Sequence, residues 1–170
     1  MFEVENTGGG APFCLEGVTV TNPNGDGLHM LSDGSPCSVR LTSCAIADCR
    51  TTGVTANGAN ASLELKLVDC LVLRNGEDGV YPCNGARVQI SGASSRIRSN
   101  GCPGLYSGFG GSIKVSGLGT KPALTRQEYG EHFFSGATTS ALFSETGAHP
   151  NKAGDVNVLE AISGSVVFLS

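Results

Sequence analysis

The sequence predicts an all-β chain folded as a parallel β-helix, a solenoid in which each turn of chain stacks on the turn before it. The first observation is a repeat with a period of 26 residues, because Cys44–Val54 aligns with Cys70–Val80 without a gap. The second is the alternation of apolar residues within each copy, as in Leu63, Leu65 and Leu67, which indicates strands with one buried face. The third is composition: 25 glycines, no tryptophan and 15% charged residues are typical of many short strands joined by tight turns.

The repeat extends in both directions from this stretch. Six positions keep apolar or glycine character through three copies: Phe13, Leu15, Val18, Val20, Gly27 and Leu28, then Val39, Leu41, Cys44, Ile46, Gly53 and Val54, then Leu65, Leu67, Cys70, Val72, Gly79 and Val80. A fourth copy holds Val88, Ile90, Ile97, Gly104 and Leu105, and a fifth begins at Ile113 and Val115. Three short strands fit in each copy, around 62–67, 70–73 and 79–82 in the third. Stacking in register places like residues about 4.8 Å apart, so we expect a solenoid of about four to six rungs.

Several recurring residues acquire structural roles from this stacking. Gly27, Gly53, Gly79 and Gly104 are expected at a bend that needs either positive φ or close backbone approach. Asn75 and Asn100, four residues before two of these glycines, are expected to bond the backbone of adjacent rungs, with Cys49 in the same place one rung earlier. Cys44 and Cys70 fall on one repeat position and are interpreted as two buried thiols rather than a disulfide.

The domain prediction follows from where the repeat ends. Residues 1–118 are assigned to the solenoid, with Phe2–Val4 as a first strand. Residues 119–170 are expected to form an irregular capping segment with a short helix from Pro122 and final strands, including 155–158 and 165–169, because an open solenoid end exposes core and unpaired strand edges. The N-terminal end is less protected, so we expect its first rung to meet a partner, through self-association or otherwise, or to continue a longer chain.

The segment 64–90 resembles a known repeat. Its pattern, apolar-x-apolar-x-x-Cys/Asn-x-Ile/Val-x-x-Asn-x-x-x-Gly-Val/Ile, is similar to the right-handed parallel β-helix repeats of the pectate-lyase-like superfamily, over about residues 13–118. The resemblance implies a right-handed, single-stranded solenoid. Similar repeats occur in carbohydrate-active enzymes and in non-catalytic substrate-binding modules, so the resemblance is informative about fold and much less about function.

The candidate chemistry lies near the first glycine of the repeat. The segment 22–30, which contains Asp26 and His29, resembles the Asn-Thr-Asp-Gly-Ile-Asp/His segment of polygalacturonase-type glycoside hydrolases. Those enzymes need a further carboxylate pair on the next rung, where this chain has Thr52-Gly53. Asp78 and Tyr81 align with Asp26 and His29 two rungs away, about 10 Å by strand spacing, and the four residues are a candidate site for a sugar or a cation. The alternative, which we favour, is that these aspartates are solvated turn residues.

Two arginines complete the candidate set. Arg96-Ile97-Arg98 resembles the Arg-Ile-Lys segment of the same hydrolases, so Arg96 and Arg98 are candidate ligand-binding residues. No spacing typical of a metal site is present, since the three histidines lie in different regions, and we expect neither a metal nor another cofactor.

Charge and cysteine content limit the classes of partner and the cellular setting that the sequence suggests. The formal net charge of −4 and the absence of a basic run argue against nucleic acid, and no apolar stretch approaches membrane-spanning length. Seven cysteines, an odd number, and an N-terminus without a basic start and apolar run favour reduced thiols and a cytoplasmic setting, although export by a separate leader stays open.

Two main functions remain as hypotheses. The first, which we favour, is a non-catalytic β-helix module that presents a flat face to a protein or a glycan. The second is a carbohydrate-active enzyme, a polysaccharide lyase or a glycoside hydrolase, acting on acidic polysaccharide through Asp26, Asp78 and an arginine. A structural spacer or assembly subunit is a third possibility.

Overall fold

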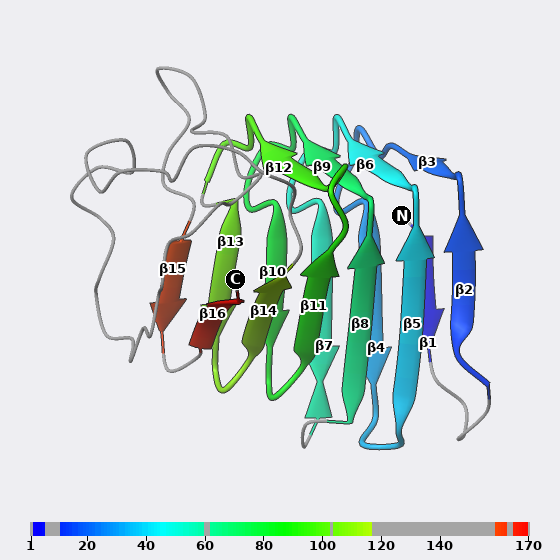
Figure 1. The fold of residues 1–170 in the computed structure, drawn as a ribbon, viewed down its shortest axis with the longest axis vertical. Helices are drawn as coiled ribbons and strands as arrows, with labels where there is room; N and C mark the ends of the chain where they lie inside the picture. Colours follow the sequence, from blue (N-terminus) through cyan, green and yellow to red (C-terminus); the bar gives the residue numbers. More distant parts are fainter. Residues whose placement is uncertain are drawn as a thin grey trace.

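The computed structural model describes residues 2–5, 11–59, 62–102, 104–116, 159–162 and 165–169. These residues form a parallel β-solenoid built from three sheets, which we call A, B and C (Figure 1). The chain passes through sheets B, C and A in turn, and four complete turns are described. The predicted all-β parallel solenoid is therefore confirmed.

Sheets A and B carry the long strands. Sheet A contains β1 (Phe2–Glu5), β4 (Leu28–Ser32), β7 (Val54–Gly58), β10 (Val80–Cys83), β13 (Leu105–Gly108) and β15 (Leu159–Ile162). Sheet B contains β2 (Phe13–Glu16), β5 (Cys37–Thr42), β8 (Leu63–Val68), β11 (Arg87–Ser91), β14 (Ser112–Ser116) and β16 (Ser165–Leu169). The strands of A and B run in opposite directions, as Figure 1 shows.

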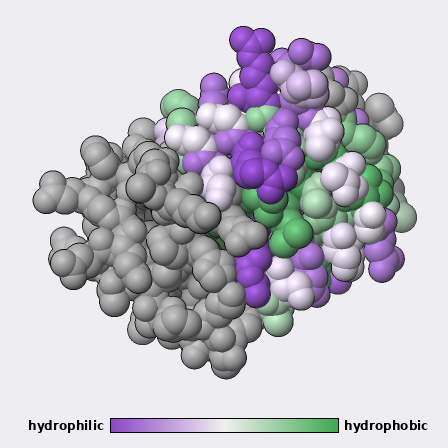
Figure 2. Space-filling model, turned by 90° about the horizontal axis from the view of Figure 1, so that it is seen from above, coloured by the Kyte–Doolittle hydropathy of each residue, from purple (hydrophilic) through white to green (hydrophobic). Residues whose placement is uncertain are grey.

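Sheet C is the short sheet at the top of Figure 1. It contains β3 (Thr19–Val20), β6 (Ala45–Ala47), β9 (Leu71–Leu73) and β12 (Arg96–Arg98). Seen from this side, the surface shows an apolar area bordered by hydrophilic side chains (Figure 2). The exposed Leu71 belongs to β9, and the exposed Val18 directly precedes β3.

The strand register matches the alignment of the repeat. Val39 pairs with Leu65, Ile46 with Val72 and Val54 with Val80, so each inward position forms a column of like residues through the molecule. These columns make up one continuous core of buried aliphatic side chains and thiols. Fully burying one such aliphatic side chain stabilises the fold by about 1.5–3 kcal/mol. The apolar repeat seen in the sequence is thus the core itself.

The first and last described segments of the chain are both strands. β1 and β16 are strands, as expected for 2–4 and 165–169, and β15 and β16 extend sheets A and B. The expected helix from Pro122 and the strand 155–158 lie outside the described residues, so the capping role of 119–170 stays a prediction.

All seven cysteines are free thiols. The Cys44 and Cys70 thiols each donate to backbone carbonyls of their own and the preceding rung, those of Thr42 and Leu15 for Cys44.

The corner between sheets C and A is held by asparagine. Asn75 Oδ1 accepts from the Cys49 backbone N–H, and Asn100 Oδ1 accepts from the Asn75 backbone N–H, both at 3.1 Å. The Asn75 amide also donates to Asn100 Oδ1 at 2.9 Å, and all three residues are buried. Each rung therefore satisfies a buried backbone donor of the rung before it.

The repeat glycines sit against this asparagine column. A Cβ at Gly53 would lie 2.5 Å from Asn75 Nδ2, and one at Gly79 would meet Asn100 Nδ2 at 2.8 Å as well as the Gly104 carbonyl oxygen. Gly27 is similarly close to the Cys49 thiol. None of these three glycines has positive φ, so the requirement is close approach. The left-handed corner residues are instead mostly not glycine; they include Ser43, Asp48, Asp69, Arg74 and Ser99.

We expect Asn75→Ala to lower the free energy of unfolding by about 2–3 kcal/mol, because it leaves the buried Cys49 N–H without an acceptor and removes the amide donor to Asn100. Denaturant unfolding followed by circular dichroism measures the change. Asn24→Ala is the matched control, because the Asn24 side chain is exposed, and it should stay within about 0.5 kcal/mol of the parent. Equal effects of the two substitutions would contradict the role of the asparagine column.

Candidate binding face of sheet A

The outer face of sheet A gathers two of the predicted site residues into one column. The register pairs Glu3 with His29, His29 with Thr55 and Thr55 with Tyr81. Tyr106 follows on the next strand, because Val80 pairs with Leu105. His29, Tyr81 and Tyr106 are partly exposed and Thr55 is buried. The column thus contains two tyrosines and a histidine separated by one short side chain.

The two tyrosines form a stacked pair. Their ring centroids lie 4.9 Å apart with an interplanar angle of 18°. The Tyr81 ring leans over β13, where a Cβ at Gly108 would lie 3.3 Å from it. Burial, together with the nearby Cys83 thiol to which the hydroxyl is hydrogen-bonded, raises the pKa of Tyr81 to about 12. Tyr81 therefore keeps its hydroxyl proton throughout the neutral range and is held in one orientation.

The other face of the Tyr81 ring borders a much smaller residue. Tyr106 covers the side toward β13, while the column position on β7 holds only Thr55. His29 follows on β4, two rungs from Tyr81, or about 10 Å by strand spacing. Two larger side chains thus flank a short one along the column.

Asp26 fixes the corner at the edge of this face. Its Oδ1 accepts hydrogen bonds from the Thr51 hydroxyl and the Thr52 backbone N–H, and its Oδ2 accepts from the Thr55 hydroxyl at 2.9 Å. All three donors belong to the next rung. The carboxylate is therefore a cross-rung clamp.

The other predicted site residues are separated from Asp26. The backbone bonds at this corner run from Gly27 N to Thr52 O and from Gly53 N to Asp78 O, so Thr52 lies in the rung between the two aspartates. Arg96 and Arg98 lie on β12 in sheet C, and Arg96 Nη1 donates to the carbonyls of Ala93 and Ser95 at 2.7 Å. The structure places His29 and Tyr81 in one column of sheet A, two rungs apart, whereas Arg96 and Arg98 belong to a strand of sheet C.

The sequence pattern did not identify Tyr106 or the threonine partners of Asp26 as part of this face. A signal for Tyr106 was present, because it follows Tyr81 by the same 25 residues that separate Gly104 from Gly79.

In the described part of the chain, no group of three or more His, Cys, Asp or Glu side chains is placed to hold a metal ion, and no helix is long and apolar enough to cross a membrane.

We expect Asp26→Ala to destabilise the protein by about 1–3 kcal/mol, because the Thr52 N–H and two threonine hydroxyls lose their shared acceptor. Thermal and denaturant unfolding measure this change. Glu77→Gln, which alters an exposed carboxylate, is the control and should leave stability nearly unchanged. An Asp26→Ala variant as stable as the parent would remove the clamp interpretation.

Alkaline pH should weaken the fold partly through Tyr81. Its folded-state pKa of about 12 lies above the ordinary value of 10, so its contribution is complete below pH 10 and is lost between pH 10 and 12. We expect the free energy of unfolding to fall less steeply over this window in Tyr81→Phe than in the parent. Denaturant titrations at several pH values test this, with pH 7 as the reference. Parallel slopes in the two proteins would show that Tyr81 does not contribute.

Comparison of the chain with protein-family models, with curated proteins and with solved structures found no match in any of the three. The parallel β-solenoid therefore rests on the strand register, and function has to be inferred from the geometry of the faces.

Proposed function

We propose that this chain is a non-catalytic β-solenoid module that binds a glycan along the outer face of sheet A. Membership of the pectate-lyase-like superfamily is part of this proposal and rests on the repeat residues alone. The observation that carries it is the stacked pair of Tyr81 and Tyr106 on an otherwise polar column.

The chemistry of the face suits a sugar. A pyranose has an apolar ring face that packs on an aromatic ring, and hydroxyls that need hydrogen-bonding partners around it. The Tyr81 ring supplies a flat, oriented surface beside the short Thr55, and His29 supplies ring nitrogens further along the column. Tyrosine gives such contact area at low conformational-entropy cost, because it has only two side-chain torsions.

A glycan is favoured over a protein partner by the composition of this face. Protein interfaces usually centre on a buried apolar cluster, whereas this column places two partly exposed tyrosines beside the polar side chains of Thr55 and His29. The enzyme alternative would need Asp26 as an acid, base or nucleophile, yet its carboxylate accepts three hydrogen bonds from the next rung. We therefore assign binding rather than catalysis to this face.

The test is binding of the purified protein to a panel of neutral and acidic soluble polysaccharides by affinity electrophoresis, followed by titration calorimetry on those retained. Tyr81→Ala should weaken binding about two- to tenfold, since an aromatic contact of this kind contributes about 0.5–1.5 kcal/mol. Tyr81→Phe should bind almost as tightly as the parent, because the ring face is kept.

The matched control is Phe109→Asn. It removes a ring that is 63% exposed, at a positive-φ position that asparagine tolerates, and should not change glycan affinity. If no polysaccharide is retained, or if Tyr81→Ala binds like the parent, glycan binding on this face is refuted. Release of reducing ends or of unsaturated products from any polysaccharide would favour the enzyme instead.

A further inference from the structure

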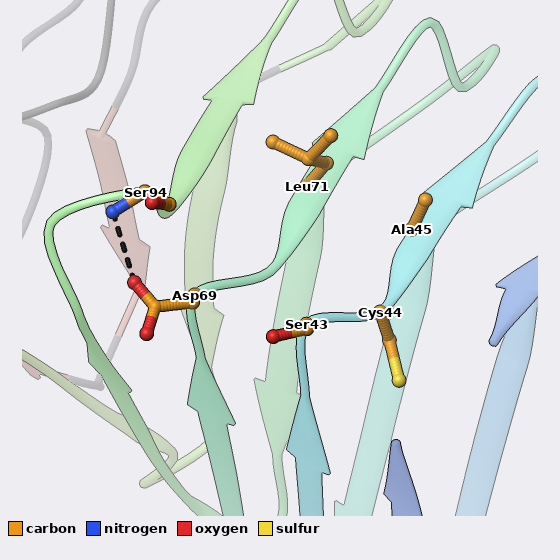
Figure 3. A pocket seen from close by; sticks show the side chains of 6 residues that line it. All are labelled: Ser43, Cys44, Ala45, Asp69, Leu71 and Ser94. Carbon is orange, nitrogen blue, oxygen red and sulfur yellow. Dashed lines mark hydrogen bonds between the residues drawn. The ribbon is translucent and has the colours of Figure 1, made fainter. Parts of the chain in front are cut away.

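A pocket lies on a different part of the molecule, at the corner between sheets B and C (Figure 3). Its volume is about 380 Å³, and it spans three successive turns of the solenoid. It is lined by Ser43, Cys44, Ala45, Asp69, Leu71 and Ser94. The Cys44 thiol is turned to the core, where it donates to the Leu15 and Thr42 carbonyls. The groups that a ligand would meet are therefore those of the other five residues.

The polar side chains of this pocket can all accept a hydrogen bond, since they are one carboxylate and two serine hydroxyls. Asp69 Oδ1 accepts from the Ser94 backbone N–H at 2.9 Å, which orients the carboxylate (Figure 3). Asp69 Oδ2 and the hydroxyls of Ser43 and Ser94 have no hydrogen-bond partner among the described residues. The pocket thus offers one negative charge and several lone pairs to a donor.

The carboxylate also lacks a counter-ion within the described part of the chain. The salt bridges there join Lys66 to Glu64 and Arg74 to Asp48. Arg96, the cation on the rung beside Leu71, donates instead to two backbone carbonyls. Charge complementarity therefore favours a cationic ligand.

The floor of the pocket is apolar. Leu71 is 38% exposed, and Ala45, its register partner on β6, is partly exposed. Figure 3 shows both side chains on β9 and β6, next to the segments that carry Ser43 and Asp69. An aliphatic stem that packs on these two residues would remove apolar surface from water.

We propose that this pocket binds a primary ammonium group carried on an unbranched alkyl stem. The ammonium donates to Asp69 Oδ2 and to the serine hydroxyls, and the methylene groups pack on Leu71 and Ala45. Two sources have this chemistry: the lysine side chain of a partner protein and a free aliphatic amine. The pocket and the sheet A face share no residue, so this proposal stands independently of glycan binding.

The experiment is a titration of the isotope-labelled protein with n-butylammonium, n-butanol and n-butyrate, followed by amide chemical shifts. We expect n-butylammonium to shift the Ser43, Asp69, Leu71 and Ser94 amides, and the neutral and anionic analogues to bind at least about threefold more weakly, the scale of an exposed ion pair. Parallel titrations with an N-acetylated lysine amide and with 1,5-diaminopentane show which source binds more tightly. Equal binding of n-butanol would refute the ammonium site.

Two variants make the test specific. Asp69→Asn removes the charge, yet asparagine suits the positive φ of this position and can still accept from Ser94, so folding is retained. It should weaken n-butylammonium binding at least about threefold, while Glu77→Gln, with the same charge change elsewhere, should not. Leu71→Lys places an ammonium of the protein's own at the pocket and should abolish binding of the probe. Unchanged affinity in either pocket variant would overturn the proposal.

Discussion

The hydrogen bonds that pass from one rung to the next at the corner between sheets C and A are the interaction on which the rest of this solenoid depends. A chain that turns sharply in a buried corner leaves backbone N–H groups that no strand partner can satisfy. The Asn75 side chain accepts from the Cys49 N–H and donates to the Ile46 carbonyl. One rung later, the Asn100 side chain accepts from the Asn75 N–H and donates to the Val72 carbonyl. Gly53 and Gly79 leave the space that these side chains occupy. The asparagine column and the glycine column therefore depend on each other, because the asparagine side chains fit only where the glycines leave space.

Much of this fold could be predicted because stacking in register turns a sequence period directly into columns. The offset that aligned Val54 with Val80 is the register of β7 and β10, and the same offset put His29 and Tyr81 in one column. The left-handed corners were not predictable in this way. Asp69 and Arg74 have positive φ, but different residue types adopt that conformation on successive rungs, so no repeated letter marks the position. The threonine partners of Asp26 depend on side-chain torsions and leave no period in the sequence. The two tyrosines do repeat at a spacing of 25 residues, but the stacking of their rings also depends on side-chain torsions.

The inward and outward positions of each strand are under different constraints. An inward residue such as Val80 has to match its neighbours in volume, because the core is continuous along the solenoid axis. An outward residue has to match only the solvent and the next rung. Function therefore has to be sought in outward residues that are costly or unusual there, such as a stacked pair of tyrosines or a carboxylate that has no counter-ion among the described residues. By this criterion the repeat glycines and asparagines are not candidates for a binding function, whereas Tyr81 and Asp69 are.

Both proposed sites draw their main contacts from complete turns that have a neighbour on each side. Tyr81 on β10 is held between β7 and β13, and Asp69 follows β8, which lies between β5 and β11. In a solenoid each rung contacts only its neighbours, so local opening is easiest at the terminal rungs and hardest where two neighbours must separate. A side chain on a middle rung is therefore already held in position before a ligand arrives, and binding needs less ordering of the protein. At the two proposed sites this rigidity comes from the rungs on either side, so binding there would need no lid.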